Sequence, residues 1–271
     1  MAQVLPLSGA ITADIDFERR FGGIARLYGD TALAAFRNAH VCVIGVGGVG
    51  SWAVEALARS AVGQITLIDL DHLAESNVNR QIHALTDTLG KAKVGALAER
   101  IAQINPFCRV SEIEDFVTED NLASLIVPGR FDYVIDAIDN ARAKTALVVH
   151  CRAHQIPVVM IGSAGGQIDP TRIAIVDLSR TEQEPLLARV RKRLRAHHGF
   201  PRGTKNKFEI DAVYSTEPLR HPELCATDED APGITGLNCA GYGSAVVVTA
   251  SFGFVAAGFV LRKLAEKAAE V

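Results

Sequence analysis

The sequence predicts an α/β fold: a doubly wound, Rossmann-like, mostly parallel sheet, extended at its C-terminal side by further strands and an apolar helix. Two observations predict this fold class. Apolar strand segments alternate with helical segments between residues 41 and 161, and such alternation favours parallel strands covered by helices on both faces. A glycine-rich stretch, GVGGVGS at residues 45–51, separates the first strand from its helix, which is typical of a phosphate-binding turn.

Hydrophobic periodicity assigns the elements in order. The expected helices cover residues 17–36, 51–60, 91–104, 119–126 and 141–154, and the expected strands cover 41–44, 64–70, 108–113, 131–137 and 157–161. Thr118 is the expected N-cap of the fourth helix. After Gly162 the pattern changes, and two further strands are expected over 167–176 and 212–216. We expect a single domain over 1–271, with a nucleotide-binding core over 17–165 and a C-terminal part over 166–271.

Composition excludes several classes of protein. The 271 residues carry a net charge of −3, so charge alone does not indicate nucleic acid or membrane. The five cysteines include no C-x-x-C pair, which argues against a disulfide framework and a zinc site. Cys42, in the middle of a strand, is expected in the core. The first residues do not read as a signal peptide, and we expect a cytoplasmic protein.

An apolar stretch without charged residues runs from 244 to 261. Its length is close to that of a membrane span, but Thr249, Ser251, Gly253 and Gly258 interrupt it. A helix buried in the protein is the favoured interpretation, and peripheral membrane association stays open.

Polar residues follow the expected strands at 64–70 and 131–137. Asp69 and Asp71 end the second strand, where an acid can bind a ribose hydroxyl. Arg80, Gln81 and Lys93 come next in the chain and could reach a triphosphate. Asp139 follows the strand at 131–137 and is placed to bind Mg²⁺ or to orient the nucleotide; the alternative is an N-cap for the next helix. His83 is a further candidate for the lining of the cleft.

Five motifs in this order resemble the ThiF/MoeB superfamily, the adenylating fold of ubiquitin-activating enzymes. They read GVGGVGS at 45–51, DLD at 69–71, SNVNRQ at 76–81, KAKV at 91–94 and DAIDN at 136–140. Five further stretches resemble its tRNA threonylcarbamoyladenosine dehydratase branch and extend the similarity over nearly the whole chain. They read FGGIARLYG at 21–29, NRQIHA at 79–84, GGQIDP at 165–170, YSTE at 214–217 and SFGFV at 251–255.

The resemblance implies a function and assigns residues to it. It implies ATP-dependent dehydration, by cyclisation, of N6-threonylcarbamoyladenosine beside the anticodon of tRNA, through adenylation of the threonine carboxylate. Catalytic roles fall on Arg80, Lys93 and Asp139, and Asp139 is also the expected ligand of Mg²⁺. The expected ATP contacts are Gly45, Gly47, Gly48, Gly50, Asp69, Asp71, Asn77, Arg80, Gln81, Lys93 and Asp139.

The resemblance also implies partners. It implies a homodimer, possible contact with a cysteine desulfurase or sulfur-acceptor system, and a possible monovalent cation. Many members supply an arginine to the neighbouring subunit from the first helix, but Gly23 stands at that position here. Arg19, Arg20 or Arg26 could substitute for it.

A basic segment without acids, at 188–207, is the candidate tRNA contact. The alternative is a solvated helix face followed by a loop. Its candidate residues are Arg189, Arg191, Lys192, Arg193, Arg195, Arg202, Lys205 and Lys207.

Two other functions are alternatives to the dehydratase. One is an adenylyltransferase for a ubiquitin-like sulfur carrier, in which Cys225 or Cys239 could form a thioester; buried structural cysteines are the favoured interpretation of both. The other is a non-catalytic nucleotide-sensing or sulfur-relay adaptor. The basic segment favours the dehydratase over the sulfur-carrier enzyme. The intact Arg80, Lys93 and Asp139 argue against the adaptor.

Overall fold

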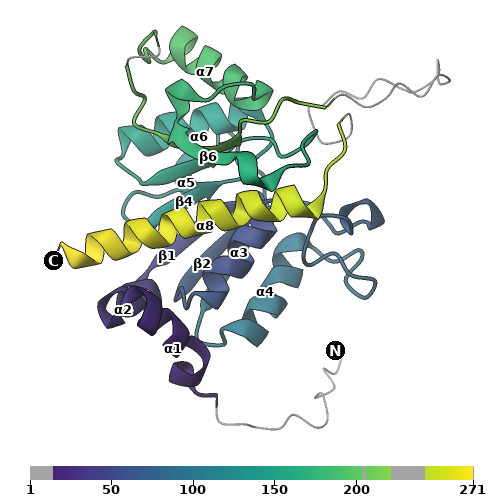
Figure 1. Ribbon diagram of the computed structural model, residues 1–271, viewed down its shortest axis with the longest axis vertical. Coiled ribbons are helices and arrows are strands. Elements are labelled where there is room, and N and C mark those ends of the chain that lie inside the picture. The colour runs from purple at the N-terminus through teal and green to yellow at the C-terminus, as the bar shows by residue number, and fades with distance from the viewer. Residues whose placement is uncertain (1–14, 204–205, 221–241, 271) are drawn as a thin grey trace.

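A computed structural model of the chain describes residues 15–203, 206–220 and 242–270. Its centre is a seven-stranded sheet in the order β3-β2-β1-β4-β5-β7-β6 (Figure 1). The strands are β1 (His40–Ile44), β2 (Gln64–Ile68), β3 (Arg109–Ile113), β4 (Tyr133–Asp136), β5 (Val158–Ile161), β6 (Ile173–Asp177) and β7 (Asp211–Ser215). All neighbouring pairs are parallel except β6 with β7. The predicted fold class is confirmed.

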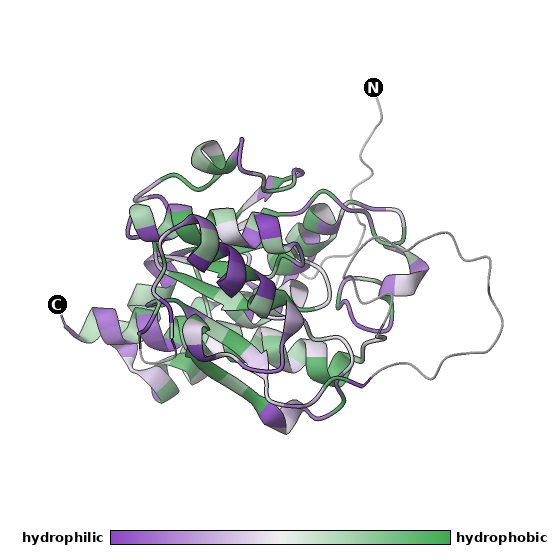
Figure 2. Cartoon of the chain, turned by 90° about the horizontal axis from the view of Figure 1, so that it is seen from above, coloured by the Kyte–Doolittle hydropathy of each residue, from purple (hydrophilic) through white to green (hydrophobic). Residues whose placement is uncertain are grey.

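Helices cover both faces of the sheet. They are α1 (Phe17–Tyr28), α2 (Asp30–Asn38), α3 (Gly50–Arg59), α4 (Lys93–Ile104), α5 (Leu122–Leu125), α6 (Ala141–Ala153), α7 (Pro185–His197) and α8 (Val246–Ala269). One apolar core joins the sheet to α2, α3, α4 and α8, and a second joins it to α5, α6 and α7. The inner strands β1, β4 and β5 are mostly apolar and fully buried (Figure 2), as expected for strands covered on both faces.

The register of the three central strands fixes where the polar loops meet. Ile44 at the end of β1 pairs with Ile68 at the end of β2 and with Asp136 at the end of β4. Parallel strands therefore end together at one edge of the sheet, and the loops that follow them lie side by side. In doubly wound sheets this is the edge where ligands bind.

Helix α8 contains the apolar stretch and crosses the sheet beside α3 (Figure 1). By length and composition it could span a membrane, but 56% of its most apolar window is buried inside the protein. A side chain at Gly253 would place its Cβ 2.5 Å from the Val49 carbonyl oxygen and 2.8 Å from the Ala53 amide nitrogen. The helix is thus packed closely on α3, as the favoured interpretation of a buried helix predicts.

The structure corrects three expected elements and one expected helix cap. The helix expected over 17–36 is two helices, because Gly29 adopts φ +90° between them. The strand expected over 167–176 begins only at Ile173, since Pro170 starts a short 3₁₀ turn that Asp169 caps. The helix expected over 119–126 shrinks to α5, and its N-cap is Asn121. The side chain of Thr118 instead accepts a hydrogen bond from the Asn121 amide. The other elements differ from expectation by about three residues or fewer at either end.

Candidate nucleotide-binding site

The glycine turn after β1 depends on backbone crowding that only glycine permits. Gly45 adopts φ +81°, and a Cβ there would lie 2.8 Å from the carbonyl oxygen of Ala137. At Gly50 a Cβ would collide with the carbonyl oxygen of Gly45. The turn therefore brings β1, the loop after β4 and the first turn of α3 together, with the N-terminus of α3 open to an anion.

Asp69 fastens this turn to the end of β2. One carboxylate oxygen accepts a hydrogen bond from the Val46 amide at 2.8 Å, and the other accepts from the Asp71 amide at 2.9 Å. The side chain is nearly buried, and this burial raises the pKa of its carboxyl while the charge of Lys93 opposes the rise. Each oxygen keeps a lone pair for a further donor.

Asp71 and Lys93 form an ion pair beside the turn. The Lys93 Nζ lies 2.7 Å from Asp71 Oδ2. The lysine side chain is 7% exposed, and the aspartate side chain is 54% exposed. The pair also ties the first residue of α4 to the end of β2. A buried ammonium held at the cleft edge is suited to bind a phosphate oxygen as a point charge.

The loop at 76–81 lies directly over the glycines. A Cβ at Gly48 would lie 3.2 Å from the aliphatic carbons of Arg80, and one at Gly47 would lie 3.6 Å from Gln81 Nε2. The indole N–H of Trp52 donates to the Arg80 carbonyl oxygen at 2.9 Å, which fixes the loop on α3. Asn77 shapes the turn by accepting a hydrogen bond from the Ala74 amide at 3.1 Å. The loop thus places Arg80 and Gln81 against the glycine turn.

Asp139 stands exposed in the loop after β4. The N-cap of α6 is Asn140, whose side chain accepts from the amides of Arg142 and Ala143 at 2.9 and 3.1 Å. Within the described ranges the Asp139 carboxylate has no hydrogen-bonding or ionic partner, so the alternative role as helix cap does not hold. The carboxylate is therefore available to a ligand at the same sheet edge.

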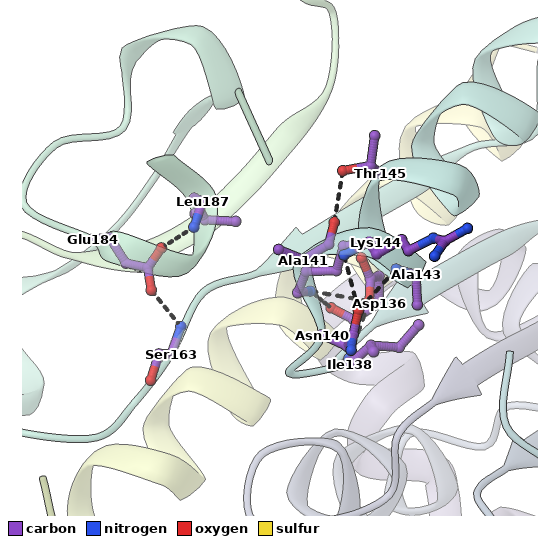
Figure 3. Close-up of polar contacts among 11 residues, drawn as sticks. Asp136, Ile138, Asn140, Ala141, Ala143, Lys144, Thr145, Ser163, Glu184 and Leu187 are labelled. Carbon is purple, nitrogen blue, oxygen red and sulfur yellow. Dashed lines mark hydrogen bonds and ion pairs between the residues drawn. The ribbon is translucent and has the colours of Figure 1, made fainter. Parts of the chain in front are cut away.

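A buried ion pair joins the end of β4, just before this loop, to α6 (Figure 3). Lys144 on α6 and Asp136 at the end of β4 are both fully buried, with Nζ 3.0 Å from Oδ1 and 3.1 Å from the Asp136 carbonyl oxygen. Burial raises the pKa of the Asp136 carboxyl, and Lys144 opposes that change. Glu184, at the start of α7, accepts hydrogen bonds from the amides of Ser163 and Leu187. Residues around the ends of β4 and β5 are thus held by buried charges.

His83 does not line the cleft as expected. Only 2% of the residue is exposed, and neither ring nitrogen has a hydrogen-bond partner in the described structure. Burial, with the positive charges of Lys93 and Arg100, lowers its pKa to about 3. It is a neutral core residue behind Lys93.

The remaining candidates fall into three groups. Arg20 on α1 donates to the carbonyl oxygens of Gln103 and Ile104, and the guanidinium of Arg26 lies near Gly22 and Gly23. Cys42 is buried, as expected. Cys225, Cys239 and Lys205 lie outside the described residues. No group of three metal-binding side chains occurs in the part of the chain that the structure describes.

Known proteins with this architecture identify the family. Residues 21–270 match the model of the ThiF family. The tRNA threonylcarbamoyladenosine dehydratase of Escherichia coli K12 is 52% identical over 258 residues, covering 93% of this chain and 96% of the relative. The Haemophilus influenzae enzyme of the same name is 50% identical, covering 95% and 98%. The chain belongs to the ThiF family, among its tRNA threonylcarbamoyladenosine dehydratases.

Solved structures of this family agree with the sequence comparison. The E. coli dehydratase in complex with ATP superimposes with a TM-score of 0.84 at 51% identity, covering 93% of this chain and 96% of that one. The molybdopterin-synthase adenylyltransferase of Salmonella typhimurium is 33% identical over 125 residues, covering 46% of this chain and 49% of the relative. The resemblance inferred from the motifs is confirmed.

Sequence reasoning missed the residues that hold the site in place. Asn140, Lys144 and Glu184 were not singled out, although each supports a residue of the sheet edge. A signal was present for Lys144, since it stands on the apolar side of a helix with Leu147, Val148 and Cys151, all buried. A lysine on such a face must be paired when buried.

Proposed function

We propose that the chain uses ATP to dehydrate N6-threonylcarbamoyladenosine beside the anticodon of tRNA into its cyclic form. The observation that carries this proposal is the end-to-end similarity to curated dehydratases, at 52% identity to the E. coli enzyme. The geometry of the sheet edge supports it, because β1, β2 and β4 end together there, Arg80 lies against the glycine turn, and Lys93 pairs with Asp71 after β2.

We propose that ATP binds at the glycine turn. The triphosphate would lie against the glycine turn and the N-terminus of α3, where backbone amides and the helix dipole favour an anion. Arg80, Gln81 and Lys93 surround this position. Asp69 is our first assignment for the ribose hydroxyls, because its carboxylate sits at the turn with lone pairs to spare, and the exposed Asp71 is the second.

Mg²⁺ fits the site only together with the nucleotide. Asp139 is an exposed carboxylate at this sheet edge, and the described residues hold no group of three metal-binding side chains. Magnesium commonly binds through one or two carboxylates and the phosphates of a substrate. When bound, it would neutralise phosphate charge. The monovalent cation stays a prediction.

The chemistry needs orientation more than a protein nucleophile. The threonine carboxylate attacks the α-phosphorus of ATP, and pyrophosphate leaves as the acyl adenylate forms. The carbamoyl group of the same nucleoside then attacks the activated carbonyl, the ring closes, and AMP leaves. This second attack is intramolecular, so alignment supplies much of the acceleration. Arg80 and Lys93 stabilise the negative charge that develops at the α-phosphate.

Partners follow from the family and from the surface. Substrate tRNA is implied by the proposed activity, and the basic helix α7 is its proposed contact. A second copy of the chain is proposed to cover the exposed apolar side of α8, where Val247 is 54% and Phe254 47% exposed. Contact with a cysteine desulfurase and a cytoplasmic location stay predictions from the resemblance.

Replacing Asp139 tests the assignment of the cleft. We expect Asp139→Ala to lower tRNA-dependent AMP formation by about 100-fold or more, because a charged group at the transferring phosphoryl is lost. Asp30→Ala is the matched control: it also removes an exposed aspartate, from α2, which leads into the opposite end of β1. AMP release by Asp139→Ala at the wild-type rate would contradict the assignment.

A further inference from the structure

A cavity of about 450 Å³ opens on the outer side of α7, in the layer opposite α8. Four cationic side chains line it: Arg191, Lys192, Arg195 and Arg202. The rest of the lining is small, consisting of Ala188, Ala196 and Gly203, and contains no acidic residue. A cavity with this charge and without a carboxylate in its walls is suited to an anion.

Two of the four cations are held in place before any ligand binds. The Arg191 guanidinium donates to the hydroxyl oxygen of Thr181. Arg195 donates to the carbonyl oxygen of Pro201 at 3.3 Å, and its guanidinium lies 5.1 Å from the centre of the Phe208 ring. Fixing these side chains in advance reduces the entropy cost of binding.

Burial and a neighbouring positive charge both disfavour the charged form of Arg191. Both lower its pKa, and the neighbouring charge is that of Arg195. Glu182, Glu184 and Tyr214 act on it in the opposite direction, but their effects are smaller. An anion between the guanidiniums would relieve this repulsion.

The structure divides the basic segment into two groups. Arg189 is exposed on α7 and Lys207 is exposed after the loop, and neither lines the cavity. Arg193 is on a different side of the helix, where its charge acts on Glu119. A merely solvated helix face would not gather one group of cations around a cavity while leaving the other outside it.

We propose that this cavity binds a phosphodiester-linked nucleotide of the substrate RNA, away from the cleft that binds ATP. The inference rests on the proposed function and adds a defined site to it. The volume exceeds what one phosphate needs and lies within the range of pockets that hold small organic ligands. Bidentate guanidiniums and small walls suit a phosphate with its sugar.

The test compares two double variants that each remove two exposed positive charges. Lys192→Ala with Arg202→Ala empties the rim of the cavity, and Arg189→Ala with Lys207→Ala removes charges outside it. We expect the cavity variant to bind tRNA about 10- to 30-fold more weakly at near-physiological salt, with a salt slope shallower by about 1.5. The control variant should lose less than about 3-fold. Binding is measured by fluorescence anisotropy with labelled tRNA over a salt series.

Steady-state kinetics separate this site from the ATP cleft. The cavity variant should raise KM for tRNA while kcat and KM for ATP stay at wild-type values. Equal losses in both variants would overturn the proposal, leaving only a diffuse basic surface. A raised KM for ATP would also overturn it, because the cavity would then hold a free nucleotide. If the wild-type protein converts no tRNA at all, the proposed function itself fails.

Discussion

At the scale of single residues, the site is built in two layers. Asp139, Arg80 and Lys93 are the residues proposed to contact the nucleotide, and each was singled out from its place in a motif. Behind them, Asp69 holds the turn, Asn140 caps α6, and Lys144 pairs with Asp136. The motifs assign the first layer, and that assignment stays a prediction. The second layer depends on which side chains meet after folding, and a one-dimensional pattern does not contain that information.

His83 should make stability depend on pH. Its pKa is about 3 in the folded chain against an ordinary value of 6.5. Between these values the unfolded chain binds more protons, so stability rises with pH and is lost as pH falls below 6.5. Each pH unit in this window costs up to about 1.4 kcal/mol. In urea titrations between pH 6.5 and 4.5, His83→Leu should therefore flatten the fall in the free energy of unfolding.

The control for this effect is His197→Leu, which removes an exposed histidine at the end of α7. It should keep the wild-type slope. A His83→Leu protein whose stability falls with pH as steeply as that of the wild type would show that His83 is charged in the folded chain.

Lys144 should be essential for stability, because its removal leaves the Asp136 carboxylate buried without a cation. Breaking a buried pair in this way typically costs about 3–5 kcal/mol, whereas replacing both partners with apolar residues often costs little. We expect Lys144→Met to lower the free energy of unfolding by that amount. The double variant with Asp136→Leu should recover part of the loss. A double variant no more stable than Lys144→Met alone would contradict the claim that removing the lysine leaves an unpaired buried charge.

At the scale of elements, most helices and strands could be predicted because hydrophobic periodicity and glycine placement agree along the core. The failures have local causes. Gly29 breaks one helix by its positive φ, and Pro170 delays β6. The short α5 contributes few buried residues, so its length was poorly determined by periodicity. Neither the antiparallel direction of β6 nor its edge position is evident from its own sequence, because both depend on its pairing with β7, a strand more than thirty residues further along the chain.

Two glycines in α8 offer a matched test of its packing on α3. Gly253 leaves no space for a side chain, whereas a Cβ at Gly258 would meet no atom within 4 Å. We expect Gly253→Ala to destabilise the protein by about 1–3 kcal/mol through overpacking. Gly258→Ala should stabilise it by up to about 1 kcal/mol through helix propensity. Thermal or urea unfolding measures both, and a Gly253→Ala protein as stable as Gly258→Ala would contradict the close packing.

At the scale of the whole molecule, two sites lie in different parts of one α/β unit. The proposed ATP site lies where β1, β2 and β4 end, and the basic cavity lies on α7. Glu184, the N-cap of α7, also accepts a hydrogen bond from the Ser163 amide (Figure 3). It therefore ties the start of α7 to the loop after β5.

Nucleoside analysis tests the central claim most directly. The purified chain is incubated with ATP, Mg²⁺ and tRNA that carries threonylcarbamoyladenosine, and the digested nucleosides are analysed by mass spectrometry. The account predicts ATP-dependent conversion to a nucleoside lighter by one water, with one AMP formed for each nucleoside converted. Unchanged threonylcarbamoyladenosine, in a preparation that binds ATP and tRNA, would contradict it.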